Sequence, residues 1–438
     1  MGVYVPSTAA EQKELLSTVG LNSLDELYQV VPKEALVSKL ELPVGKSELE
    51  VVDTLSKLAN KNQRFQSIFR GAGAYRHYIP AIVQSVTSKE EFRTAYTPYQ
   101  AEISQGVLQS IFEYQTQICE LTGMEVSNAS MYDGASAAAE AVLMCQERKR
   151  QDVIISATVD PQTIAVVKTY CASRKVPVHV VAADKCATDI AALESTMNAG
   201  TAAVLVQSPN YYGVIEDIDA IVAATHSNGA KLVMSFNPIS LGLLKTPGEY
   251  GVDIAVGEGQ ALGMPLSFGG PYLGLMTCTK KLMRKMPGRI VGETSDAKGR
   301  RAFVLTLQAR EQHIRREKAS SNVCSNEALC AMTASVYLAA MGPKGIYQVA
   351  QSCTAHAHYL QRCLEEIPGF SLRDTRPFFH EFLTNCPFDA EQIVAKLSER
   401  GILAGLPVAG GLLWCCTELN NREQIDLLIA ALKEVSGV

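Results

Sequence analysis

The chain contains 438 residues with a mass of 47.3 kDa, of which 47% are hydrophobic and 19% are charged. This composition excludes a disordered or low-complexity protein and predicts a globular protein of at most about three domains. The 40 basic and 45 acidic residues give a net charge of −5, which argues against a nucleic-acid-binding protein.

The chain has twelve cysteines, which lie in apolar helical segments or, for Cys415 and Cys416, side by side. The amino-terminal residues lack the basic and apolar regions of a secretory signal peptide. We therefore predict free thiols and a cytoplasmic location. The uncharged segment 328–342 is too short to cross a membrane and contains polar residues, so we expect no membrane association.

Residues 1–62 are predicted to form a helical arm. The segments Ser23–Glu26 and Ser47–Glu50 have the spacing of capping boxes, and Pro32 and Pro43 separate the short helices. Such an arm is too small to bury a core of its own. We expect it to pack on the rest of the chain or on a partner.

Residues 63–325 are predicted to form a large α/β domain, because apolar, β-branched runs alternate with helical segments. Two helices are expected first, over 102–122 and 134–147. The expected strands are 153–157, 178–182, 203–206, 232–235, 253–256 and 272–278, and helices are expected over 162–173, 190–198 and 218–227. This alternation indicates a mainly parallel sheet that is covered on both faces.

Residues 326–438 are predicted to form a smaller α+β domain. A helix over 326–341 is expected to end at Gly342-Pro343, because glycine and proline terminate helices. The remaining helices are expected over 347–366, 390–399 and 422–435, and short strands over 379–383 and 412–415.

Two glycine-containing segments are candidate ligand loops. The segment 128–140 is small and polar and leads into a helix, whose free amides can bind an anion. The alternative, which the local sequence favours, is ordinary capping by Asp133 or Ser136. Gly269-Gly270 precedes Pro271, and this segment is a candidate for close approach to a ligand, although the local sequence favours a wide turn between strands.

Residues 96–102, the tyrosine loop, place Tyr96, Tyr99, Gln100 and Glu102 directly before a helix, and Pro98 fixes the turn. Aromatic hydroxyl groups on a rigid loop suit contact with a ligand or partner. Anchoring of the following helix explains the same residues equally well, so both interpretations stay open.

Residues 280–318, the basic segment, contain 12 basic and 4 acidic residues and therefore carry a charge of +8. A solvated helix face is the ordinary explanation for such a run, and a surface for an acidic partner is the more specific one. The seven histidines are scattered without metal-site spacing, so we predict no metal site.

Four longer segments together resemble the glycine-cleavage P-protein family: residues 71–80, 94–106, 128–141 and 310–318. The resemblance is to the N-terminal half of the long form, or to the first subunit of the two-subunit form. It implies an aspartate-aminotransferase-like fold, fold type I of the pyridoxal-phosphate enzymes, with a smaller C-terminal α+β domain. In this family a lysine binds pyridoxal phosphate, glycine is decarboxylated, and the aminomethyl group passes to the lipoyl group of H-protein. T-protein and L-protein complete the system.

The sequence departs from the family pattern at the cofactor. The family lysine lies nine positions before a Gly-Gly-Pro run, and that position is Gln260 here. The strand that should supply the carboxylate for the pyridine ring ends in Asn237. The resemblance therefore implies a subunit without its own cofactor chemistry, whose lysine-bearing partner, the second P-protein subunit, binds pyridoxal phosphate covalently. A self-sufficient homodimeric enzyme and a purely structural or regulatory pseudoenzyme subunit are the alternatives.

The resemblance also assigns roles to residues. We expect the partner's active site to receive Tyr96, Tyr99, Gln100 and Glu102, with Tyr75, His77 and Arg70 as second candidates. A vestigial cofactor pocket is expected at Asp133, Gly134, Ala135, Ser136, Asn237, Gly269 and Gly270. The surface for H-protein is expected at Arg310, Arg315, Arg316 and Lys318.

Overall fold

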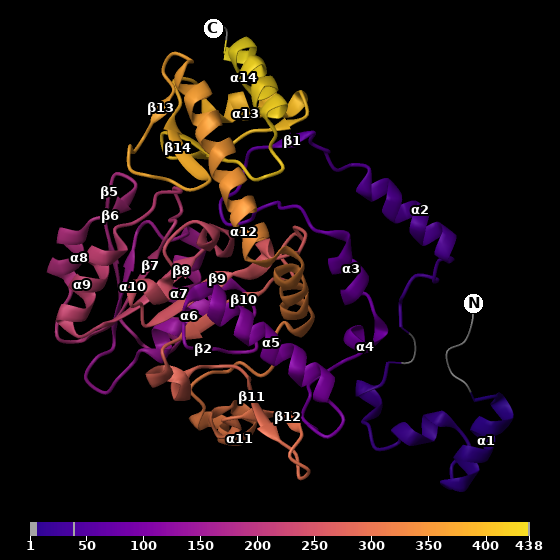
Figure 1. Cartoon of the computed structure of the whole chain (residues 1–438). Coiled ribbons are helices and arrows are strands. Elements are labelled where there is room, and N and C mark those ends of the chain that lie inside the picture. Colours follow the sequence, from indigo (N-terminus) through magenta and orange to yellow (C-terminus); the bar gives the residue numbers. More distant parts are fainter. Residues whose placement is uncertain (1–6, 38–39, 437–438) are drawn as a thin grey trace. The chain divides into compact units, whose positions relative to one another are not determined.

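The computed structural model describes residues 7–37 and 40–436, and the chain divides into two units between Arg64 and Phe65 (Figure 1). The first unit contains α1 (Ala9–Thr18), η1 (Leu24–Tyr28), η2 (Lys33–Ala35) and α2 (Glu48–Ala59). The predicted arm and the predicted C-terminal domain each extend beyond the described residues, by 1–6 and 38–39 and by 437–438 respectively.

One of the two predicted capping boxes forms. Ser47 Oγ accepts from the amide of Glu50 at 3.3 Å, and the Glu50 carboxylate accepts from the amide of Ser47 at 2.8 Å. The prediction for Ser23 is wrong, because its side chain makes no capping hydrogen bond. Glu26 instead accepts from the amide of Asn22 at 3.0 Å, and a short 3-10 helix follows Ser23.

The second unit is built on a seven-stranded sheet with the strand order β2-β10-β9-β8-β7-β3-β4. Neighbouring strands from β4 to β9 run parallel, and β10 pairs antiparallel with β9 and β2. The strands are β2 (Val126–Ser127), β3 (Asp152–Ser156), β4 (Val178–Val181), β7 (Thr201–Gln207), β8 (Lys231–Phe236), β9 (Ile254–Glu258) and β10 (Gly274–Cys278). The predicted strands are confirmed to within two residues at their ends.

Alternating side chains cover both faces of this sheet, as the period of two requires. In β7, Val204 and Val206 belong to one buried cluster, and Ala203 and Leu205 belong to the other. The first cluster includes residues of α5 (Gln105–Thr122), α8 (Ile190–Thr196), α9 (Ile218–Asn228) and α12 (Ala328–Glu365). The second includes residues of α6 (Gly134–Met144) and α7 (Pro161–Ser173).

The C-terminal part surrounds a smaller sheet with the order β13-β14-β17-β16. Its elements are β13 (Ser371–Leu372), β14 (Glu381–Asn385), α13 (Ala390–Glu399), β16 (Leu406–Val408), β17 (Gly411–Cys415) and α14 (Arg422–Ser436). The break expected at Gly342-Pro343 is present within α12, which consists of two helices across a kink, because Gly342 has a non-helical backbone with a φ of 59° and a ψ of 178°. Because α12 contributes to the cores of both sheets, the domain boundary at Ser325 stays a prediction.

The basic segment forms a β-hairpin rather than a helix over much of its length. Strands β11 (Ile290–Ser295) and β12 (Arg301–Thr306) pair antiparallel, and only the short α11 (Gln312–Arg315) follows. Val291 and Phe303 are buried against α5, and Gln105 of α5 pairs with the backbone of Phe303. In the part of the chain that the structure describes, no helix combines the length and the apolar character needed to cross a membrane.

Candidate functional site

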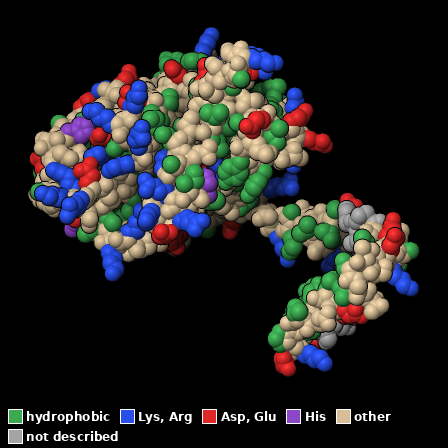
Figure 2. Space-filling model, turned by 90° about the horizontal axis from the view of Figure 1, so that it is seen from below, with side chains coloured by type: hydrophobic (Ala, Val, Ile, Leu, Met, Phe, Trp, Pro, Cys, Tyr) green, Lys and Arg blue, Asp and Glu red, His purple; other side chains and the backbone are tan. Residues whose placement is uncertain are grey.

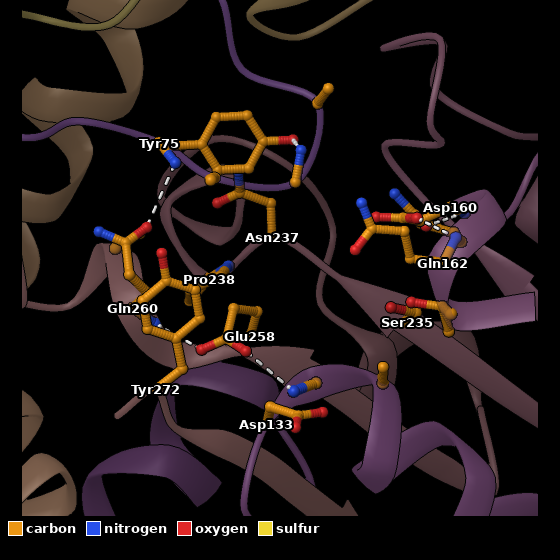
Figure 3. Close-up of a pocket in the computed structure, with 18 of the residues that line it drawn as sticks. Tyr75, Asp133, Asp160, Gln162, Ser235, Asn237, Pro238, Glu258, Gln260 and Tyr272 are labelled. Carbon is orange, nitrogen blue, oxygen red and sulfur yellow. Dashed lines mark hydrogen bonds between the residues drawn. The ribbon is translucent and has the colours of Figure 1, made fainter. Parts of the chain in front are cut away.

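A cavity of about 490 Å³, the central cavity, lies beyond the carboxyl ends of the parallel strands (Figure 3). Its walls include residues that follow β3, β7, β8 and β9, namely Asp160, Pro209, Asn237 and Gln260. In open parallel sheets, ligands bind at this edge. The cavity is therefore the candidate site.

The cavity brings together most of the residues predicted for a vestigial pocket. Asp133, Gly134, Ala135, Asn237, Gly269 and Gly270 all line it. Ser136 does not, because its hydroxyl group donates back to the carbonyl of Asp133. The Asp133 side chain accepts from the amide of Ser136 at 2.7 Å, so the capping interpretation of this turn is confirmed.

The first amide of α6 donates to Glu258, a residue that the sequence analysis did not single out. Gly134 N lies 2.9 Å from Glu258 Oε2, and the other carboxylate oxygen accepts from the amides of Gln260 and Leu273, each at 3.0 Å. A Cβ atom at position 134 would lie 2.9 Å from Glu258 N, so glycine is needed for this approach. Burial raises the pKa of Glu258 to about 7, although the three amide donors act in the opposite direction.

Gln260 is 1% exposed, and both ends of its side-chain amide are hydrogen-bonded. The amide nitrogen donates to the carbonyl of Met264 at 2.8 Å, and the oxygen accepts from the amide of Tyr75 at 3.2 Å (Figure 3). The side chain therefore links two segments of the cavity wall.

A second buried carboxylate, Glu381, lies at the start of β14. It accepts from the amide of Ala72 at 2.6 Å and from the hydroxyl group of Tyr75 at 2.5 Å. Burial raises the pKa of Glu381 to about 7. The neighbouring His380 is also buried, and desolvation lowers its pKa well below the usual range. Its Nε2 atom lies 3.4 Å from Nδ2 of Asn237.

The charge of the central cavity is one-sided. Among the described residues, no lysine or arginine lines it. Five acidic residues do, namely Asp133, Asp160, Glu258, Glu327 and Glu381. Burial raises the pKa values of Asp160 and Glu327 as well. In the part of the chain that the structure describes, no cationic side chain in the walls is available to an anionic ligand.

The tyrosine loop lies outside this cavity and is exposed. Tyr96 is 86% exposed and Tyr99 is 52% exposed, and the side chains of Gln100 and Glu102 are also exposed. The Tyr99 ring lies 5.5 Å from the guanidinium carbon of Arg289 and 5.8 Å from the ring of His313. Because both of these residues belong to the basic segment, the tyrosine loop contacts the basic segment through Tyr99.

The second candidates for the partner's site are engaged within the chain. Arg70 donates to the carbonyls of Ala404 and Gly405. Tyr75 lines this chain's own cavity. His77 is buried, and its Nδ1 atom lies 2.8 Å from a Glu418 oxygen that also accepts from Cys353 at 3.5 Å. The possible metal-ligand atoms of these three side chains, His77, Cys353 and Glu418, all lie within 4.8 Å of one another. The hydrogen bonds among the three side chains explain this proximity.

The residues expected to face H-protein differ in their exposure to solvent. Arg315, Arg316 and Lys318 are exposed. Arg310 is half-buried and donates to the carbonyls of Met286 and Gly288, so it holds its own loop instead of facing outward. Figure 2 shows Lys and Arg side chains spread over the lower face of the second unit, on which β11, β12 and α11 lie.

Comparison with known proteins agrees with this geometry. Residues 2–432 match the family described as the glycine cleavage system P-protein. The probable glycine dehydrogenase (decarboxylating) subunit 1 of Moorella thermoacetica is 48% identical over 99% of both chains, and its counterpart in Desulforamulus reducens is 48% identical over 99% of this chain and 100% of its own.

Solved structures place the fold. A crystal structure of glycine decarboxylase (P-protein) of the glycine cleavage system, in inhibitor-bound form, matches with a TM-score of 0.94 and 43% identity, over 99% of this chain and 100% of the other. An alanine–glyoxylate aminotransferase from Nostoc matches with a TM-score of 0.59 and 15% identity, over 91% and 98% of the two chains. The chain therefore has the predicted fold type I of the pyridoxal-phosphate-dependent enzymes.

Proposed function

The chain belongs to the glycine cleavage system P-protein family, and we propose that it is the subunit of a heteromeric P-protein that lacks the Schiff-base lysine. A second, lysine-bearing subunit binds pyridoxal phosphate. Together the two subunits decarboxylate glycine and transfer the aminomethyl group to the lipoyl group of H-protein, in series with T-protein and L-protein. The name "subunit 1" carried by the relatives supports a two-subunit enzyme.

The observation that carries this proposal is the buried amide of Gln260. A Schiff base requires a primary amine, and the amide nitrogen of Gln260 is neither nucleophilic nor free, because it donates to Met264. Asn237 offers no fixed negative charge to a pyridine ring, and no lysine or arginine among the described residues lines the cavity. The residues present do not fit the cofactor, so no step is assigned to it in this chain.

We assign the tyrosine loop to the partner's active site. The side chains of Tyr96, Gln100 and Glu102 are exposed and make no hydrogen bond within the described residues, so they are available to a second subunit. Their role there is to position glycine or the lipoyl arm, which accelerates a reaction by lowering the entropy cost of bringing the groups together.

The exposed Arg315, Arg316 and Lys318, which adjoin the tyrosine loop through His313, are assigned to the docking of an acidic H-protein. The twelve unpaired cysteines support a location in the reducing cytoplasm.

Exchange of the glycine carboxyl group with bicarbonate tests the proposal. We expect no activity from this chain alone, none or little from the second subunit alone, and full activity from the mixture with H-protein. Activity of this chain alone would refute the two-subunit assignment. A second subunit that is fully active alone would instead favour a purely structural or regulatory role for this chain.

A further inference from the structure

The carboxylate of Glu258 lies where a helix N-terminus would receive an anion. Its Oε2 atom accepts from Gly134 N, the first amide of α6, at 2.9 Å, and both residues line the central cavity, where Figure 3 shows Glu258 close to Asp133. The exposed amides and the helix dipole make such a position favourable for a phosphate group. We propose that Glu258 occupies the phosphate position of this chain's own cavity, and that it excludes phosphate-bearing ligands from the cavity.

Both carboxyl oxygens of Glu258 accept hydrogen bonds from backbone amides. Oε1 accepts from the amides of Gln260 and Leu273, each at 3.0 Å, while Oε2 is bonded to Gly134. The three donors come from the turn after β9, from the segment before β10 and from the start of α6. Backbone amides that converge on one acceptor are the arrangement of an anion site, and here the acceptor is a carboxyl group of the chain itself.

The side chains near Glu258 also disfavour a bound phosphate. Asp133 caps the same helix and lines the cavity beside Gly134, and Glu327 also lines it. No lysine or arginine lines the cavity in the described chain, so a bound phosphate would meet three carboxylates without a compensating cation. Two separate features therefore exclude phosphate, namely the occupied amide and the acidic wall.

The role of Glu258 rests on the proposed function in one respect, because it assumes that the second subunit holds the cofactor. In this chain, the absence of a lysine is not the only feature that prevents the binding of pyridoxal phosphate. A pyridoxal phosphate bound without a covalent link is excluded as well, because its phosphate group has no free position.

The test compares phosphate binding to the full-length wild-type chain and to Glu258→Ala, with inorganic phosphate as the probe. Isothermal titration and the phosphate-dependent rise in Tm are the two readouts. We expect Glu258→Ala to bind phosphate at least about tenfold more tightly than the wild type, because the Gly134 amide and the space of the carboxyl group are both freed. Equal affinities in the two chains would overturn the inference.

Glu327→Ala is the matched control, since it removes a carboxylate from the same cavity and leaves the Gly134–Glu258 bond in place. Because the Gly134 amide stays occupied, we expect a gain in phosphate affinity clearly smaller than that of Glu258→Ala, and a gain equal to it would overturn the specific role of Glu258. If Glu258→Ala does not fold, Glu258→Ser replaces it. Its shorter side chain also vacates the position beside the Gly134 amide, and an affinity no higher than that of the wild type would again overturn the inference.

The outcome is separable from that of the proposed function. Tight phosphate binding by the wild-type chain would refute the role of Glu258 and leave the lysine assignment untouched. A covalent pyridoxal adduct on the wild-type chain would refute the proposed function, whatever the phosphate titration gives.

Discussion

The backbone amide of Tyr75 donates a hydrogen bond to the side-chain oxygen of Gln260, with 3.2 Å between the two atoms. The amide nitrogen of Gln260 donates in turn to the carbonyl of Met264 at 2.8 Å. At the position that we propose corresponds to the family lysine, the buried amide of Gln260 joins two segments of the cavity wall. The position therefore has a structural use in this chain.

Replacing Gln260 by lysine should therefore not restore an enzyme. Gln260→Lys removes the acceptor for Tyr75 and buries an ammonium group, so we expect a loss of about 2–5 kcal/mol of unfolding free energy in urea. The control Gln260→Met loses the same hydrogen bonds without burying a charge, and it should be destabilised less. A lysine variant that is as stable as the wild type and forms a lasting Schiff base with pyridoxal phosphate would contradict this prediction.

Glu381 should make the stability of the protein depend on pH. Its pKa of about 7 in the folded chain exceeds the ordinary value of 4.5, because the group is buried. Between these two values the folded chain holds a proton that the unfolded chain has released, so stability falls as the pH rises through this window. Glu381→Gln lacks the titrating group and should not lose stability in this way. Relative to the wild type, its free energy of unfolding should increase by up to about 3 kcal/mol as the pH rises from about 5 to about 8.

The glutamine at position 381 can keep both hydrogen bonds, since its oxygen can accept from Ala72 N and its amide nitrogen can donate to the Tyr75 hydroxyl oxygen. Urea unfolding at several pH values measures the effect. Glu258 is unchanged in both chains, so the difference between their pH profiles isolates Glu381. Parallel profiles would show that Glu381 is ionised in the folded protein throughout this range.

Periodicity in the sequence was sufficient to predict the central sheet. The strands over 203–206 and 232–235 are confirmed as β7 and β8, because buried parallel strands read as continuous apolar runs. The hairpin β11–β12 was missed, because basic side chains on its exposed face obscure the alternation of Val291 and Phe303, which are buried. Local charge suggested a helix there, and packing against α5 determined a hairpin.

The tyrosine loop gives the third prediction. In the reconstituted pair, Tyr96→Phe and Glu102→Gln should each lower the glycine–bicarbonate exchange rate by about 10- to 100-fold, the cost of misplaced reacting groups. Tyr347→Phe, at another exposed tyrosine, on α12, is the control and should leave the rate unchanged. Wild-type rates for both loop variants would leave the loop with only its role at the start of α5.

The basic segment gives the fourth prediction. Charge reversal at Arg315 and Arg316 should raise the apparent KM for H-protein by about fivefold for each ion pair lost, since an exposed ion pair contributes up to about 1 kcal/mol. Reversal at the exposed pair Arg148 and Lys149 is the control, because it changes the net charge equally at another surface. If both double variants raise KM alike, the effect is one of overall charge, and the docking assignment fails.

The candidate site was only partly accessible from the sequence. Gln260, Asn237 and the Asp133–Ser136 turn could be located by their spacing within motifs, and all but Ser136 contribute to the cavity wall. Glu258 and Glu381 were missed, because an isolated carboxylate carries no spacing signal. The one available sign was their position within apolar runs, where a buried charge needs several donors. Which donors they find, Gly134 and Ala72, depends on tertiary contacts between distant segments.

The most direct measurement of the central claim is borohydride reduction of the two-subunit enzyme in the presence of pyridoxal phosphate, followed by peptide mapping of both chains. Reduction fixes a Schiff base permanently on the lysine that forms it. We expect the pyridoxyl group on a lysine of the second subunit and none on this chain. A pyridoxyl group on any lysine of this chain, at an occupancy comparable to that of the second subunit, would contradict the account.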